Sequence, residues 1–180
     1  MALATPDGVT RIDVGTAAEM HAAVMARVRD CAVFVGCAAV ADYRPAAPAA
    51  GKIKKTAERL TVELVRNPDI LAEVAARDGA PFTVGFAAET ERLAEQAEAK
   101  RRAKGLDMIA ANLVGGAAGG FEADDNALTV LWEGGGETLE RAPKSELARA
   151  LAALIAKRFA ESRGTPAPLS PRVTQGDAGS

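Results

Sequence analysis

The residues best suited to chemistry lie on either side of a loop rich in Pro, Ala and Gly. Asp42 follows the apolar run Cys31–Ala39, and its carboxylate could bind a ribose hydroxyl, a substrate amide or a magnesium-bound water. A carboxylate that caps a turn explains the same residue equally well. Lys52, Lys54 and Lys55 come after the loop, where several ammonium groups could close over an anion such as a triphosphate. Lysines also protect exposed strand edges from aggregation, and this alternative stays open.

Two further stretches offer backbone groups to a ligand. A ligand could reach the backbone N–H and C=O groups of Gly36, Cys37, Ala38 and Ala39, because these side chains are small. Such backbone groups can hydrogen-bond to a base or hold a phosphate. Close packing of a helix on a sheet requires the same small residues, so this alternative stays open. In Asn67-Pro68-Asp69, we expect Asn67 to cap a helix and Pro68 to be its first residue. The amides at that helix start could also face a polar or anionic ligand.

Lys100 and Lys104 lie four residues apart, on one face of a predicted helix. They could contact a ligand or simply be solvated. If residues 90–104 form one straight helix that starts at the binding edge of the sheet, its last residues lie on the order of 20 Å from that edge. This distance argues against a contact between these lysines and a ligand. Asn112 could bind a ligand or close a turn. The glycine-rich run 115–120 lacks the Lys-Ser/Thr of a Walker A loop, and no G-x-G-x-x-G follows a first strand.

The composition excludes several classes of protein. The 180 residues carry 22 basic and 24 acidic side chains, so a broad basic surface for nucleic acid or an anionic membrane is not expected. The two cysteines, Cys31 and Cys37, and the single His21 cannot supply a zinc site or a disulfide framework, which favours a reducing cytoplasm. The longest apolar run is too short to cross a bilayer. We expect one cytoplasmic domain over 1–163 and a disordered tail over 164–180.

Strand and helix patterns alternate along the chain. Expected strands cover 9–14, 31–39, 60–65, 82–87, 108–111, 128–132 and 138–141, and expected helices cover 16–29, 67–77, 90–104 and the segment after Pro143. This order predicts an α/β, Rossmann-like fold, with a mostly parallel sheet, helices on both faces and an antiparallel hairpin extension. The apolar run 31–39 is expected at the centre of the sheet. Because ligands bind beyond the carboxyl ends of such strands, the loops 36–45, 86–90 and 110–120 are candidate binding loops.

The order of several short motifs is more specific than any one of them. The chain contains in succession "AAVADYRP", "KIKK", "NPDI", "VGFAAET", a pair of lysines, "D.IAAN" and "F.ADDNAL". From about Val9 to Phe159 it closely resembles phosphopantothenoylcysteine synthetase, the carboxy-terminal half of the bacterial bifunctional coenzyme A biosynthesis flavoprotein. The resemblance implies a CTP-dependent ligase. In that reaction 4′-phosphopantothenate and CTP form an acyl-cytidylate and pyrophosphate, and the amine of cysteine then displaces CMP.

The resemblance also implies a role for each candidate residue. Asp42 and Lys52 would be the catalytic residues, with Lys52 on the triphosphate. The positions around the reacting carboxylate and α-phosphate would be Gly36, Cys37, Ala38, Ala39 and Asp42. The cytidine pocket would be lined by Asn67, Pro68, Asp69, Ile70 and Phe86, and Lys100 and Lys104 would also contact the nucleotide. Magnesium is expected with the CTP, on ligands that stay unknown. The flavin of the decarboxylase half is not expected here.

One departure from the family's pattern leads to a further expectation. Family members begin with another strand, a glycine-rich turn and an asparagine-containing segment, whereas this chain starts near "LATPDGV". We therefore expect nucleotide binding with weak or absent synthetase activity. A homodimer is implied, with the strand 60–65 and the Trp132 hairpin as interface elements, as is a decarboxylase domain in the full-length protein. The alternatives are a noncatalytic nucleotide-binding or dimerisation module, and a nicotinamide-dependent oxidoreductase, which the missing dinucleotide motif disfavours.

Overall fold

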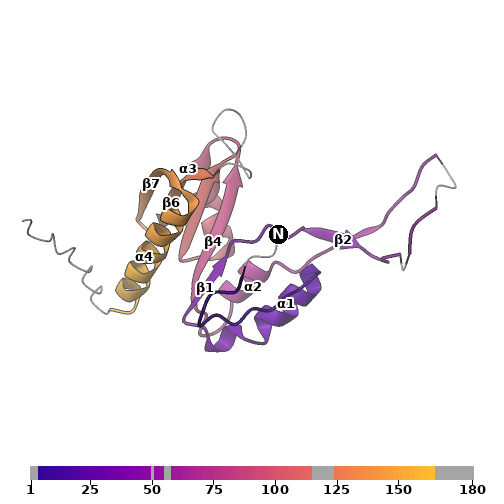
Figure 1. Cartoon of the computed structure of the whole chain (residues 1–180), viewed down its shortest axis with the longest axis horizontal. Coiled ribbons are helices and arrows are strands. Elements are labelled where there is room, and N and C mark those ends of the chain that lie inside the picture. Colours follow the sequence, from indigo (N-terminus) through magenta and orange to yellow (C-terminus); the bar gives the residue numbers. More distant parts are fainter. Residues whose placement is uncertain (1–3, 50, 55–57, 115–123, 165–180) are drawn as a thin grey trace, which may run out of the picture.

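The computed structural model describes residues 4–49, 51–54, 58–114 and 124–164. The order of its elements is α1 (Ala17–Met25), the 3-10 turn η1 (Val28–Asp30), β1 (Val33–Gly36), β2 (Tyr43–Pro45), β3 (Leu64–Arg66), α2 (Ile70–Ala75), β4 (Phe82–Glu89), α3 (Leu93–Lys104), β5 (Met108–Leu113), β6 (Asp125–Trp132), β7 (Gly135–Pro143) and α4 (Lys144–Ser162). Figure 1 shows a body of sheet and helices from which β2 and β3 extend.

The main sheet has the order β1-β4-β5-β6-β7. β1 pairs in parallel with β4, and β4 in parallel with β5, whereas β6 runs antiparallel to β5 and β7 antiparallel to β6. All of these strands except β6 therefore point the same way. The expected α/β fold, with a mostly parallel sheet and an antiparallel hairpin extension, is confirmed.

Helices cover both faces of this sheet, and the alternation of side chains along β5 shows how. Met108 packs in a core cluster with Leu151 of α4, while the next residue, Ile109, packs with Ala97 of α3. Successive strand residues point to opposite faces, so α4 and α3 lie on opposite sides of the sheet. A third cluster joins α1 and α2 through Met20, Val74 and their neighbours, and Phe34 of β1 packs against it.

The prediction that 31–39 forms a central strand is wrong. β1 covers only Val33–Gly36 and, in the part of the chain that the structure describes, it pairs with β4 alone and lies at the edge of the sheet. Val35 is 41% exposed. The residues that follow Gly36 are small and apolar because they line a cavity rather than a packed interior.

The N-terminal region also departs from its expectation. Residues 9–14 form no strand, and Val9, Ile12 and Val14 are exposed. The capping box at the start of α1 is confirmed, since the Glu19 amide donates to Thr16 Oγ1 and the Thr16 amide to Glu19 Oε2, both at 3.1 Å. The helix ends at Met25 and is followed by η1, so it is shorter than expected.

β2 and β3 form the base of a two-stranded extension that we call the arm, residues 43–49, 51–54 and 58–66 (Figure 1). Tyr43 pairs with Arg66, and Pro45 pairs with Leu64. The expected strand over 60–65 is thus regular only from Leu64. Its exposure is as expected, because Leu60 and Val62 are 68% and 51% exposed.

The later elements match their expected positions closely. The hairpin forms from longer strands than expected, and α3 begins at Leu93 rather than at residue 90. α4 begins at Lys144, directly after Pro143, as expected. The buried face of α4 consists of Leu147, Leu151, Leu154 and Ile155, whereas Ala150 is exposed and Phe159 is half-buried. The predictions for 115–120, for Lys55 and for the tail beyond residue 164 lie outside the described residues. None of the helices in the described ranges could span a membrane.

Candidate functional site

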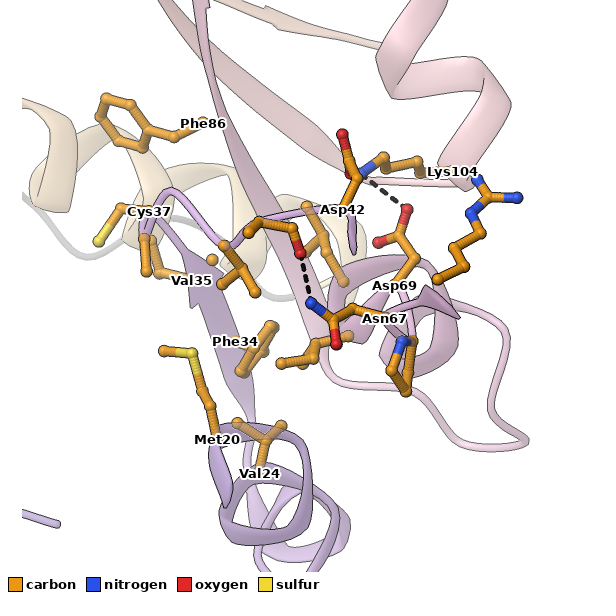
Figure 2. A pocket seen from close by; sticks show the side chains of 18 residues that line it. Met20, Val24, Phe34, Val35, Cys37, Asp42, Asn67, Asp69, Phe86 and Lys104 are labelled. Carbon is orange, nitrogen blue, oxygen red and sulfur yellow. Dashed lines mark hydrogen bonds and ion pairs between the residues drawn. The ribbon is translucent and has the colours of Figure 1, made fainter. Parts of the chain in front are cut away.

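A cavity of about 270 Å³ lies beyond the carboxyl end of β1, between that strand, α2 and the end of α3. Figure 2 shows side chains that line it, and they come from widely separated parts of the sequence. Most of the predicted site residues are brought together here: Gly36, Cys37, Ala38, Asp42, Asn67, Pro68, Asp69, Ile70, Phe86 and Lys104.

Three predicted site residues do not line this cavity. Ala39 lines an adjoining cavity, which shares five lining residues with the first: Met20, Ala38, Val40, Ala41 and Asn67. Lys52 is exposed on the arm. Lys100 reaches the end of β4, where its Nζ lies 2.5 Å from Oε1 of Glu89, a carboxylate that is only 8% exposed. The structure therefore holds Lys52 and Lys100 apart from the cavity.

A pair of glycines lets α2 approach the sheet. Gly36 and Gly85 are partners in the β1–β4 pairing, and side-chain atoms of Leu71 lie 3.2 Å and 3.1 Å from where their Cβ atoms would be. Leu71 is in the first turn of α2, so its contact with the sheet brings the start of that helix beside the end of β1. Asp69 and Ile70 reach the cavity for this reason.

Asn67 does not cap α2, contrary to the prediction. The cap residue is Asp69, whose Oδ1 accepts from the Ala72 amide at 3.1 Å. Asn67 is 8% exposed, and its side-chain amide donates to the Ala41 carbonyl at 2.8 Å (Figure 2). Its side-chain oxygen is also occupied, because it accepts from Arg44 at 2.9 Å. Because α2 begins only at Ile70, the capping position falls to Asp69, two residues beyond Asn67.

Asp69 carries the main charge interaction of the cavity wall. Its Oδ2 lies 2.9 Å from Nζ of Lys104, and Figure 2 shows the two side chains meeting beside Asn67. Burial opposes ionisation of Asp69, but hydrogen bonds from Lys104 and the Ala72 amide outweigh it, so the pKa of Asp69 lies below its ordinary value. The wall therefore presents a carboxylate and an ammonium side by side.

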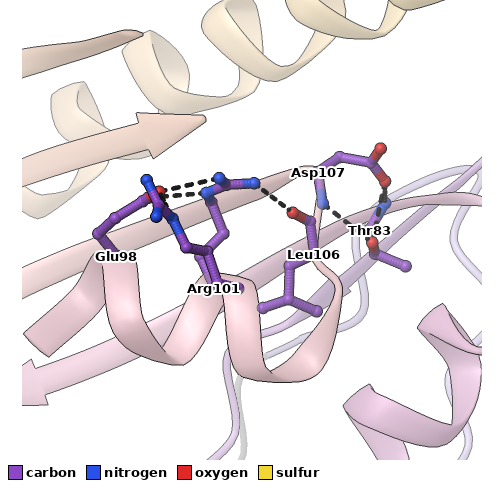
Figure 3. A network of polar contacts seen from close by, with 6 residues as sticks. Thr83, Glu98, Arg101, Leu106 and Asp107 are labelled. Carbon is purple, nitrogen blue, oxygen red and sulfur yellow. Dashed lines mark hydrogen bonds and ion pairs between the residues drawn. The ribbon is translucent and has the colours of Figure 1, made fainter. Parts of the chain in front are cut away.

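The distance argument against Lys104 is wrong, because the cavity extends to the last turn of α3. A network of polar contacts fixes this end of the helix (Figure 3). Arg101 bonds Glu98 through two nitrogens, at 2.8 and 2.9 Å, and its third donor reaches the Leu106 carbonyl at 3.0 Å. Beyond the helix, the backbone and hydroxyl of Thr83 both donate to Asp107, at 2.7 and 2.9 Å. These contacts anchor the turn that carries Lys104 to the start of β4 and β5.

Sequence reasoning missed the apolar side of the cavity. Met20 and Val24 of α1 and Phe34 of β1 line it opposite the polar residues, as Figure 2 shows. Met20 and Val24 are four residues apart, so their spacing indicated that they share one face of a helix. The spacing could not show which other element that face contacts. In the described ranges, no group of three or more His, Cys, Asp or Glu side chains could hold a metal ion.

A family model described as the DNA/pantothenate metabolism flavoprotein C-terminal domain matches residues 1–159. The chain belongs to this family. Its relatives include the coenzyme A biosynthesis bifunctional proteins CoaBC of Vibrio cholerae, 51% identical over 156 residues, and of Escherichia coli K12, 48% identical over 165 residues. These matches cover 85% and 89% of this chain but 39% and 41% of the relatives, so the chain spans about two fifths of their length.

Solved structures agree with the membership of this flavoprotein C-terminal domain family. The crystal structure of the C-terminal domain of a CoaBC protein is similar with a TM-score of 0.69 at 31% identity, over 89% of this chain and 73% of that one. A DNA/pantothenate metabolism flavoprotein from Streptococcus pneumoniae shares the fold, with a TM-score of 0.62 at 20% identity, over 79% of this chain and 70% of that one. The sequence resemblance to the carboxy-terminal half of the bifunctional protein is therefore confirmed.

Proposed function

We propose that this domain carries out the CTP-dependent ligation of 4′-phosphopantothenate to cysteine, through an acyl-cytidylate, in coenzyme A biosynthesis. The observation that carries the proposal is the convergence of the motif residues 36–38, 42, 67–70, 86 and 104 on one cavity. Membership of the family supports the same reaction.

The size of the cavity fits part of a nucleotide. At about 270 Å³ it is slightly smaller than the 300–1,000 Å³ typical of small-molecule sites. We infer that it holds the cytidine, with the apolar residues of α1 and β1 on one side of the base and polar groups on the other. The triphosphate would then extend toward Asp42 and out of the cavity, where a mobile cation could meet it.

The chemistry needs no side-chain nucleophile, because the substrate's own carboxylate attacks the α-phosphate. Catalysis then rests on positioning and on cations that stabilise the growing negative charge. Lys52 would supply such a cation after the arm closes, and Lys104 lies in the cavity wall already. Lys100 would have to exchange its contact with Glu89 for one with the nucleotide.

Magnesium would arrive with the CTP. Mg²⁺ usually keeps several waters and binds through one or two carboxylates together with substrate phosphates, rather than in an all-protein cage. Asp42 lines the cavity and could supply such a carboxylate, whereas the carboxylate of Asp69 is paired with Lys104. This arrangement agrees with the lack of a larger acidic cluster among the described residues.

Calorimetric titration with CTP, ATP and NAD⁺, each with magnesium, tests the proposal. We expect binding of CTP and much weaker binding of the other two. Preference for NAD⁺ would instead favour an oxidoreductase. A second assay, pyrophosphate release with CTP, phosphopantothenate and cysteine, separates an enzyme from a noncatalytic module, because only an enzyme releases pyrophosphate.

Lys52→Ala tests the arm directly. Loss of a charge-assisted contact of about 1.5–3 kcal/mol should weaken CTP binding roughly 10- to 150-fold without affecting folding. Lys157→Ala is the control, since it removes an equal charge from an exposed position on α4, and CTP binding should then change little. Equal affinity of wild type and Lys52→Ala would mean that the lysine is only solvated.

We also propose that the chain forms a homodimer and that a decarboxylase domain accompanies it in the full-length protein. Leu60, Val62 and Leu64 are each more than half exposed on the arm. A second copy could cover these side chains, and the hairpin at Trp132 is the other candidate interface element.

A further inference from the structure

The base of the arm is held by a compact set of hydrogen bonds around Arg44 and Asn67. One terminal nitrogen of Arg44 donates both to the Arg66 carbonyl and to the Asn67 side-chain oxygen, each at 2.9 Å. The Asn67 backbone amide donates to the Asp42 carbonyl at 2.8 Å, and its side chain donates to the Ala41 carbonyl. The chain therefore enters and leaves the arm through one junction, which we define as these five residues.

The junction belongs to the arm and to the cavity at once. Asp42, Arg66 and Asn67 line the cavity, while Arg44 pairs with Val65, and Arg66 with Tyr43, at the foot of the arm. Asn67 is nearly fully buried, with each of its polar side-chain atoms satisfied by the junction. A buried amide with two fixed partners has one preferred orientation, so the junction sets the direction in which the arm leaves the body.

The length of the arm magnifies any change at the junction. Lys52 lies seven residues beyond Pro45, and seven extended residues span up to about 23 Å. A rotation of about 10° at the base would therefore displace the far end by about 4 Å. Such a shift exceeds the length of a hydrogen bond, so a small error at the junction would be enough to take an ammonium away from a phosphate.

We propose that Arg44 is a positioning residue that aims Lys52 at the triphosphate by fixing the base of the arm through Asn67. This inference rests on the proposed CTP-dependent function. Arg44 does not itself contact the nucleotide. Its effect should consequently appear only for ligands that Lys52 can reach, which are those carrying the triphosphate.

Arg44→Gln tests the inference when CTP and CMP are titrated side by side by calorimetry. We expect CTP binding to weaken roughly 10-fold, in line with the loss of one charged contact, while CMP affinity stays within about twofold of wild type. Arg44→Lys keeps a cationic donor that can serve one of the two acceptors, and it should fall between wild type and Arg44→Gln. Should Arg44→Gln not fold, Arg44→Lys carries the same comparison. Arg29→Gln, in the exposed turn η1, is the matched control and should change neither affinity.

A double-mutant cycle with Lys52→Ala decides between positioning and general damage. If Arg44 acts through Lys52, adding Arg44→Gln to Lys52→Ala should weaken CTP binding by less than twofold further. Equal loss of CTP and CMP affinity, or full additivity with Lys52→Ala, would overturn the inference. Wild-type protein that does not bind CTP would remove the proposed function itself, whereas wild-type binding with an unaffected Arg44→Gln variant would remove only the role of Arg44.

Discussion

Asp69 performs two separable tasks, and its substitutions give a quantitative test of the site. One carboxylate oxygen caps α2 through the Ala72 amide, and the other pairs with Lys104. Asparagine caps helices as well as aspartate does, so Asp69→Asn should remove only the ion pair, whereas Asp69→Ala removes both. The Lys104 and Asp69 side chains are 36% and 43% exposed, which limits the ion pair to about 0–1 kcal/mol. Loss of the cap costs about 1 kcal/mol.

Urea unfolding at pH 7 should therefore give a decrease in the free energy of unfolding below about 1 kcal/mol for Asp69→Asn and of about 1–2 kcal/mol for Asp69→Ala. The pH dependence provides a second check. Because the pKa of Asp69 is lowered in the folded protein, the contribution of the ion pair is present above the ordinary value of 3.8 and is lost as the pH falls through the lowered pKa. Wild type and Asp69→Asn should thus converge in stability at low pH.

The same variant tests whether Lys104 serves the nucleotide. In wild type, the Lys104 ammonium must leave Asp69 before it can pair with a phosphate. The strength of this ion pair therefore sets an upper limit on how much CTP binding can improve when Asp69→Asn removes the pair. A pair of at most about 1 kcal/mol corresponds to at most roughly fivefold tighter CTP binding by Asp69→Asn. Asp78→Asn, at an exposed position, is the matched control. Weaker CTP binding by a well-folded Asp69→Asn would refute the reasoning, since it would mean that the carboxylate itself holds the ligand.

Three further predictions concern packing, pH and assembly. Gly85→Ala would place a Cβ 2.7 Å from a Leu106 methyl, so it should lower the free energy of unfolding by about 1–3 kcal/mol in urea titrations; an unchanged midpoint would contradict this. Arg101 and Arg102 lower the pKa of Glu98 to about 2 from 4.5. The stability advantage of wild type over Glu98→Gln should therefore disappear as the pH falls from about 4.5 to about 2. A difference in stability that stays constant over this pH range would contradict the prediction. Leu64→Glu should convert a dimer to monomer in light scattering if the arm is the interface, and an unaltered dimer mass would exclude that surface.

Much of the fold could be predicted from the sequence, because local patterns and chain order agree. The capping box of α1, the positions of β4 and β5 and the terminal hairpin were each readable from the sequence pattern. The position of β1 was not. A continuous run of small apolar residues is typical of a strand buried on both faces, and it is equally typical of a cavity wall. Only the pairing of the strands separates these cases, and pairing is not a local property.

The candidate site was predicted as a set of residues better than as a geometry. The motif order indicated most of the residues that line the cavity, Lys104 among them, although the length of a straight helix over 90–104 argued against that residue. It also gave no sign of the contribution of Met20 and Val24. The position of Lys104 and the contribution of Met20 and Val24 both depend on how α1, α2 and α3 pack against one another. This packing is set by contacts between elements far apart in the sequence.

Asn67 and Asp69 show why the structural and the functional interpretation of one residue could not be separated from the sequence alone. The carboxylate of Asp69 caps the start of α2 and offers a charge to the cavity; the amide of Asn67 closes the base of the arm and forms part of the cavity wall. A hydrogen-bonding group satisfied by the protein on one side can still face a ligand on the other. Truncation to alanine at either position will consequently mix stability with affinity, and only replacements that keep the internal hydrogen bond, such as Asp69→Asn, can isolate the effect on the ligand.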